Sequence, residues 1–359
     1  MEGGCSQRRV WKARMSAHEP VGRLRAYWQF LLAVFYFFVA RSLAHHAAIG
    51  LAGDQWVPLV EQGFLAFLLL MGYAALGFWL NRQMYPISAQ GLPRRQGWQG
   101  EVGLGLATGW GLALVCVLLL ALRGGIAISI STRASAWGWL VADAAFFALA
   151  ALAEEIAFRG YGFQRFVEAV GPIGASLGFA AYYAIVQSRV PGAGRASIMV
   201  SVALGLLLSA AYLRTKAIWL SWGLNFGWKA SRALLFGLAV NGVNSHSPVV
   251  QGDPMGPFWL TGGGFGVEGS WVTFILLIAA LPVVFRITRE LDFLYNAPVI
   301  VPGGIPVDLD AAARAQHEAA MGSAEPAAPA LIQIGAPAPA PPLPVRPVDP
   351  AANRTSESQ

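Results

Sequence analysis

The sequence predicts an all-α protein, a polytopic membrane helix bundle with about eight transmembrane helices. The first observation is composition. Of the 359 residues, 56% are hydrophobic and only 12% are charged, whereas globular chains average about 25% charged residues. The second is a series of apolar runs along the chain, most of them about long enough to cross a bilayer. The third is that most basic residues gather in the segments between these runs, as expected for cytoplasmic loops of a membrane protein.

Polar or Gly- and Pro-containing connections separate the expected helices. The helices are expected at residues 26–50, 57–80, 99–122, 136–168, 173–188, 196–213, 217–240 and 270–287. The fourth should continue past the membrane through Arg165 and Glu168, and Gly171-Pro172 should end it. No internal repeat is found.

Two pairs of glycines have the spacing that lets membrane helices approach closely. Gly105 and Gly109 lie on the third expected helix, and Gly223 and Gly227 lie on the seventh. Small residues four positions apart leave one helix face without side chains. Both helices are therefore expected to make close contacts.

The chain is expected to divide into a membrane domain and two tails. Residues 1–25 are polar and basic and form a cytoplasmic N-terminal tail. The membrane domain covers 26–288, and residues 289–359 form an Ala- and Pro-rich tail that reads APAPAPPLPVRPVDP in its later part. This tail cannot bury a core, so a disordered cytoplasmic segment is expected.

The distribution of basic residues predicts the orientation. A cytoplasmic N-terminus places the connections at 81–98, 159–171 and 214–216 inside, and the base-free loop 241–269 outside. Four arginines fall on the outer side as exceptions to this rule: Arg123, Arg133, Arg189 and Arg195. We expect an integral protein of the bacterial inner (plasma) membrane with both termini in the cytoplasm.

Several other classes of function lack support. The pI of about 9.6 comes from bases that flank apolar runs, which fits orientation control and anionic lipid better than nucleic acid. The cysteines and histidines have no spacing typical of a metal site. TGGGFG at 261–266 lacks the Lys-Ser/Thr of a phosphate loop.

The stretch AEEIAFRG at 153–160 carries the strongest chemical signal. Glu154 and Glu155 follow an apolar run from Trp137 that covers roughly 25 Å of helix. Acids inside a membrane are usually functional or paired, because an unpaired charge there is costly. Arg159 has the spacing for an ion pair with Glu155, and Asp143 shares a helix face with Glu154. The alternative is a helix end with solvated charges.

Two other expected helices carry polar stripes. Asn225, Lys229 and Arg232 share one face of the seventh helix. Tyr183 on the fifth helix shares its face with Phe179 and Gln187. We expect the stripes to meet the acidic helix, because polar groups in lipid need partners. Specifically, Lys229 should pair with Glu154 or Glu155, with Tyr183 and Asn225 hydrogen-bonded nearby. Alternatively, Lys229 extends to the membrane interface.

These motifs resemble the CPBP family of intramembrane proteases, also called the CAAX prenyl protease and Abi family, over roughly residues 100–288. The family is marked by EExxxR, FxxxH and HxxxN on successive helices. EEIAFR at Glu154–Arg159 matches the first motif, and FAAYY at Phe179–Tyr183 lies where the second belongs. The segment 217–229 resembles the third, and TGGGFGVEGSW precedes the last helix as in the family.

The resemblance implies a role for each matched residue. Glu154 would activate water as a general base, supported by Glu155 and Arg159. Tyr183, Asn225 and Lys229 would occupy the positions of the family's His, His and Asn. Tyrosine, with a pKa near 10, is no base at neutral pH, and an ammonium beside Glu154 would weaken that base. We expect no cofactor and no tightly bound zinc, although zinc in the active relatives is itself uncertain.

Two hypotheses remain open. One is an intramembrane endopeptidase, metalloprotease-like in ancestry, that acts on a membrane-anchored peptide or protein. The other is a pseudoenzyme that binds peptides, membrane lipid or partner proteins. A transporter is a third possibility, but no broken-helix pair is present.

Overall fold

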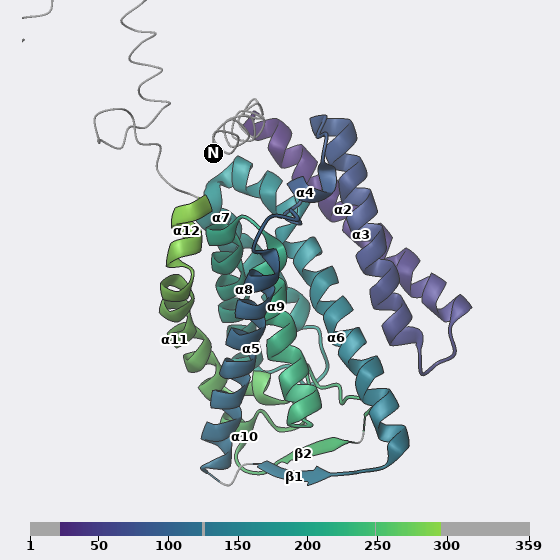
Figure 1. The fold of residues 1–359 in the computed structure, drawn as a ribbon, viewed down its shortest axis with the longest axis vertical. Helices are drawn as coiled ribbons and strands as arrows, with labels where there is room; N and C mark the ends of the chain where they lie inside the picture. Colours follow the sequence, from purple (N-terminus) through teal and green to yellow (C-terminus); the bar gives the residue numbers. More distant parts are fainter. Residues whose placement is uncertain (1–21, 124–125, 248, 296–359) are drawn as a thin grey trace, which may run out of the picture. The chain divides into compact units, whose positions relative to one another are not determined.

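In the part of the chain that the structure describes, eight long helices form the fold. Figure 1 shows how they are arranged. The computed structural model describes residues 22–123, 126–247 and 249–295, all within one compact unit, Met1–Ala297. The long helices are α2 (Arg23–Leu51), α3 (Val57–Asn81), α5 (Trp98–Ala121), α6 (Ala134–Arg159), α7 (Tyr161–Gln187), α8 (Arg195–Thr215), α9 (Ile218–Ala230) and α11 (Trp271–Ile287). The shorter elements are α4 (Pro86–Ala89), the π-helix η1 (Ser231–Leu235), α10 (Phe258–Thr261), the 3₁₀-helices η2 (Gly263–Phe265) and η3 (Val267–Gly269), and α12 (Arg289–Tyr295). The expected tails fall largely outside the described residues.

The predicted fold class is confirmed. Within the described residues, five helical segments are long and apolar enough to cross a membrane, and α11 is a shorter apolar helix. One of the five, Ala134–Gln187, joins α6 and α7. The protein is therefore an all-α integral membrane protein.

The two glycine pairs pack against each other where α5 crosses α9. A Cβ added at Gly105 would lie 2.2 Å from the carbonyl oxygen of Leu220, and one at Gly109 would lie 2.2 Å from that of Leu224. From the other side, a Cβ at Gly227 would lie 2.5 Å from the carbonyl oxygen of Leu106. The predicted close approach is confirmed, and it brings the backbones of α5 and α9 into direct contact.

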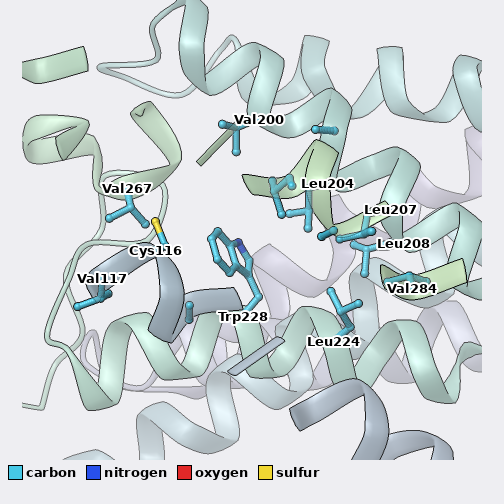
Figure 2. Packing of buried hydrophobic residues seen from close by; sticks show 14 of the residues in the cluster. Cys116, Val117, Val200, Leu204, Leu207, Leu208, Leu224, Trp228, Val267 and Val284 are labelled. Carbon is cyan, nitrogen blue, oxygen red and sulfur yellow. The ribbon is translucent and has the colours of Figure 1, made fainter. Parts of the chain in front are cut away.

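The main apolar core surrounds α9. Figure 2 shows Trp228, which is fully buried, among leucines of α8 and residues of α5 and α11. Burial of this indole against several helices fixes the rotation of α9 about its axis. Asn225 and Lys229 consequently face α6.

Two predicted helix ends differ from the structure. The fourth helix ends at Arg159 instead of continuing through Glu168, because the next residue, Gly160, leaves the helical conformation (φ −76°, ψ −144°). A Cβ there would lie 2.3 Å from the carbonyl oxygen of Ile156, so only glycine fits. The predicted break at Gly171 is present inside α7, with φ 84°. The seventh expected helix comprises α9 and the π-helix η1 and ends at Leu235 instead of residue 240, shortly before Gly237, whose φ is 62°.

A two-stranded sheet was not predicted. Strands β1 (Ile126–Ile130) and β2 (Val250–Pro254) pair antiparallel, with Ile128 opposite Gly252. The sheet lies at the end of the bundle where α5 ends and α6 begins (Figure 1). It joins two connections that are far apart in sequence.

The expected start of the disordered tail at residue 289 is wrong, because Arg289–Tyr295 form α12. The guanidinium of Arg95 lies 3.5 Å from the centre of the Tyr295 ring, and the Tyr295 hydroxyl donates a hydrogen bond to Glu101 at 3.1 Å. Arg214 forms an ion pair with Asp292 at 3.2 Å. These contacts hold the segment against the bundle.

The orientation gives a testable prediction. Because α11 separates the loop of residues 241–269 from α12, reporters fused at Asn244 and after Tyr295 should report opposite sides of the membrane. We expect the second fusion to be cytoplasmic. Alkaline phosphatase and fluorescent-protein fusions measure this directly. Both reporters on one side would refute an α11 crossing.

Candidate functional site

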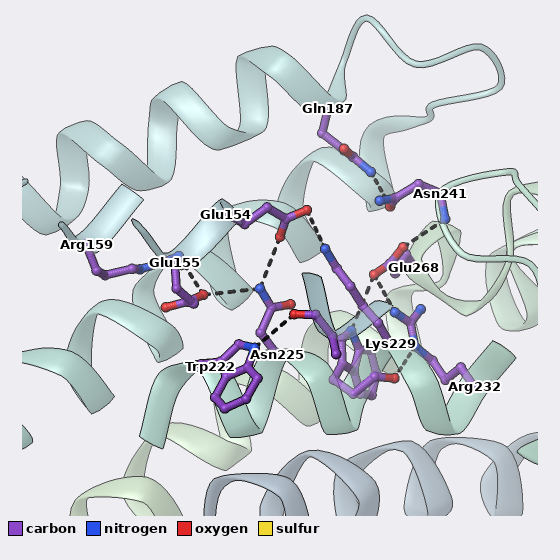
Figure 3. Close-up of polar contacts among 12 residues, drawn as sticks. Glu154, Glu155, Arg159, Gln187, Trp222, Asn225, Lys229, Arg232, Asn241 and Glu268 are labelled. Atoms are coloured by element: carbon purple, nitrogen blue, oxygen red, sulfur yellow. Dashed lines mark hydrogen bonds and ion pairs between the residues drawn. The ribbon is translucent and has the colours of Figure 1, made fainter. Parts of the chain in front are cut away.

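The end of α6 meets α9 through four polar side chains, two from each helix (Figure 3). The Lys229 ammonium lies 2.5 Å from Oε1 of Glu154. Nδ2 of Asn225 donates hydrogen bonds to Oε2 of Glu154 at 3.0 Å and to Oε1 of Glu155 at 3.1 Å. The ion pair predicted from sequence is present, and Lys229 does not extend to the interface.

Glu155 is held from a second direction. Arg159, one turn later on α6, donates to Oε1 of Glu155 at 3.1 Å and to the carbonyl oxygen of Gly205 at 3.1 Å. Both side chains are buried, with exposed fractions of 0% for Glu155 and 5% for Arg159. The Glu155–Arg159 pair therefore ties α6 to α8.

Glu154 differs from Glu155 in its surroundings. The Glu154 side chain is 28% exposed, whereas that of Lys229 is 4% exposed. Of the two neighbouring carboxylates, Glu154 is therefore the accessible one. Its cationic partner, Lys229, is buried.

Tyr183 lies beside the site without the predicted hydrogen bond. Its ring meets Phe158 edge-on, with centroids 5.3 Å apart. Within the part of the chain that the structure describes, its hydroxyl has no hydrogen-bond partner. Phe179, one turn earlier, packs in an aromatic cluster with Phe163. Gln187, one turn later, donates a hydrogen bond to the side chain of Asn241 and not to a residue of α6 or α9. The reason is that the 241–247 loop passes the end of α7.

Sequence reasoning missed Glu268, although it lies in the TGGGFGVEGSW segment. Its Oε1 accepts from Arg232 at 2.7 Å and from the Trp228 indole at 3.3 Å, and its Oε2 accepts from the backbone N–H of Asn241 at 3.1 Å. Glu268 lies in η3, outside the membrane-spanning helices. Burial opposes its ionisation, but the Arg232 guanidinium, the Lys229 ammonium and the Asn241 backbone N–H together outweigh burial and lower the pKa of Glu268. The signal that could have identified Glu268 from sequence is that it is an acidic residue in a loop without basic residues.

Asp143 does not join the site despite sharing a face of α6 with Glu154. It accepts from His246 at 2.9 Å and from the backbone N–H of Ser247 at 2.7 Å. The distance of three helical turns from Glu154 explains this separation. Asp143 instead fixes the 241–247 loop to α6.

The charges of the site balance. Three carboxylates (Glu154, Glu155 and Glu268) each contact one cation (Lys229, Arg159 and Arg232, respectively). Paired charges are the arrangement that a low-dielectric environment favours. The site therefore holds six ionisable side chains with no net charge.

This donor set does not fit a zinc ion. Among the described residues, no group of three or more His, Cys, Asp or Glu side chains is placed to hold a metal. Each site carboxylate already bonds a cation, and zinc prefers imidazole and thiolate ligands.

The pairing of the site carboxylates with cationic side chains predicts weak metal binding. After dialysis, the purified protein should contain substoichiometric zinc by mass spectrometry, because its carboxylates are neutralised by side chains. A Glu154→Ala variant should give the same content. One zinc per chain that disappears in this variant would contradict the prediction.

Fold and site together define a polytopic membrane protein with a buried, charge-paired polar centre between α6 and α9. Residues 133–231 match the family described as Type II CAAX prenyl endopeptidase Rce1-like. This match supports the predicted assignment to the CPBP/CAAX protease family, a family of membrane endopeptidases. The matched segment contains all six predicted site residues but not Glu268. No curated protein and no solved structure matches the chain.

Proposed function

We propose that this chain is a catalytically inactive member of the CAAX protease family that binds membrane partners instead of hydrolysing them. The supporting observation is the contact of 2.5 Å between Lys229 and Glu154. A general base must be free to take a proton from water. In Glu154, Oε1 already accepts from the Lys229 ammonium and Oε2 from the Asn225 amide, so both carboxylate oxygens are engaged by side chains.

The neighbouring residues offer no substitute base. Arg159 holds Glu155, and the amide of Asn225 donates to both glutamates. Because that amide is already engaged, it is a poor candidate for stabilising an oxyanion, which requires a donor aimed at the developing charge. The partners that fit this membrane protein are lipid and membrane-anchored peptides or proteins.

One observation favours an active endopeptidase as the second candidate. Glu154 keeps 28% of its side chain exposed, so a peptide carbonyl could approach it. Lys229 would then act as an electrophile after the ion pair opens. In this reading, Glu154 would be the water-activating base.

Peptide cleavage separates the two candidates. The purified protein in nanodiscs should not cleave a library of membrane-anchored peptides, with or without prenyl groups, beyond the level of a Glu154→Ala variant. Mass spectrometry of the products measures this. Cleavage by the unaltered protein that the Glu154→Ala variant lacks would overturn the proposal and establish the second candidate.

A restored motif gives the complementary test. The triple variant Tyr183→His, Asn225→His, Lys229→Asn rebuilds the family's second and third motifs. Cleavage by this variant, when the unaltered protein has none, would support an inactivated protease. A monodisperse profile in size-exclusion chromatography is the control for folding.

A further inference from the structure

Four exposed arginines lie at the end of the bundle that carries the two-stranded sheet. We call them the sheet-end arginines: Arg123, Arg133, Arg189 and Arg195. The first two flank β1, between α5 and α6. The other two lie in and after the α7–α8 connection, which contacts the α10 region because a Cβ at Gly194 would lie 3.6 Å from the Phe258 ring. All four therefore belong to one end of the fold.

This end has few acids to neutralise them. Asp54 and Asp253 are its exposed acids, whereas Asp143 and Glu268 are buried and bonded to other groups. Within the described residues, no hydrogen bond or ion pair joins a sheet-end arginine side chain to the protein. The exposed charges of this end therefore leave an excess of positive charge.

Aromatic and apolar side chains surround the same end. Exposed tryptophans lie at the starts of three long helices and in α10: Trp56, Trp137, Trp259 and Trp271. Ile130 of β1 is 73% exposed, and Met255 and Phe258 are each more than half exposed. Tryptophan concentrates at the headgroup level of membranes, where an apolar body and a polar edge are both accommodated. This belt places the sheet at that level rather than in bulk water.

We propose that the sheet end lies in the headgroup layer and that the sheet-end arginines bind the phosphate groups of anionic phospholipids in that leaflet. A guanidinium forms paired hydrogen bonds with phosphate oxygens. The positive excess favours anionic over zwitterionic headgroups. This binding also explains why these arginines break the positive-inside distribution, since lipid phosphates neutralise them. The proposal is independent of catalysis at Glu154.

Local lipid composition around β1 tests the proposal. A fluorophore on Ile130→Cys, in a Cys5→Ser background, is placed in nanodiscs whose phosphatidylglycerol or phosphatidylcholine carries a headgroup nitroxide. Quenching by the phosphatidylglycerol probe should exceed that by the phosphatidylcholine probe about fivefold, the ratio that corresponds to about 1 kcal/mol per basic contact. Changing the four sheet-end arginines to glutamine should bring the ratio close to one.

Two controls identify the cause. Changing four exposed arginines of the opposite end to glutamine (Arg82, Arg94, Arg286 and Arg289) should leave the ratio at Ile130→Cys unchanged. Changing the sheet-end arginines to lysine should keep most of the preference. Equal quenching by both lipids in the unaltered arginine background would overturn the proposal. So would an unchanged ratio in the sheet-end glutamine variant, or an equal loss in the opposite-end variant.

Discussion

Replacing Gly109 with alanine is expected to destabilise the bundle by about 3 kcal/mol, the upper part of the range for overpacked cores. The added methyl group would lie 2.2 Å from the carbonyl oxygen of Leu224 and 2.7 Å from the backbone nitrogen of Trp228. Both atoms belong to the α9 backbone, so no side-chain rotation relieves the clash. The helices must separate, and the Trp228 core must open. Thermal unfolding in detergent, followed by tryptophan fluorescence, measures the loss.

Gly111 provides a matched control on the same helix. A Cβ at this position meets nothing within 4 Å. Alanine stabilises a helix interior by up to about 1 kcal/mol relative to glycine. Gly111→Ala should therefore leave the unfolding temperature unchanged or raise it. Equal destabilisation by Gly111→Ala and Gly109→Ala would show that the effect does not come from the α5–α9 contact.

Replacing Lys229 with alanine is expected to lower the free energy of unfolding by about 3 kcal/mol, near the lower end for broken buried ion pairs. The substitution leaves Glu154 with only the amide of Asn225 as a partner. We place the effect at the lower end because Glu154 is 28% exposed and water can replace part of the lost interaction. Chemical unfolding in mixed micelles gives the value.

A double variant separates the ion pair from packing. Glu154→Gln with Lys229→Gln removes both charges and keeps similar side-chain volumes, so it should recover part of the stability lost in Lys229→Ala. The coupling energy follows from the two single glutamine variants. Additive losses in this cycle would mean that Lys229 stabilises the protein only by packing.

Long-range apolar patterning made most of the fold predictable. The eight expected helices correspond to eight long helices, and the glycine pairs predicted close approach. The break at Gly160 was not visible because a single glycine within a helical pattern is often tolerated, and the residues that follow it can themselves form a helix, as they do in α7. The β1–β2 pairing was missed because it depends on contact between connections about 120 residues apart.

Charge complementarity made part of the site predictable. The Lys229–Glu154 contact follows from the expense of unpaired charge in lipid. Glu268 was missed because its partner Arg232 lies on the same stripe as Lys229, and sequence alone does not show which base meets which acid. Tyr183 is adjacent as expected, but nothing in the sequence indicated how its hydroxyl would be oriented.

The neutrality of the six-residue polar centre has an electrical consequence. The transmembrane potential acts on net charge that moves through the field, with about 2.3 kcal/mol for each elementary charge and 100 mV. Three acids paired with three bases carry no such net charge, so motions that move them together are insensitive to voltage. Loss of one member, as in Lys229→Ala, leaves a single negative charge inside the bundle. The balance between conformations of that variant would then depend on the membrane voltage, whereas that of the unaltered protein would not.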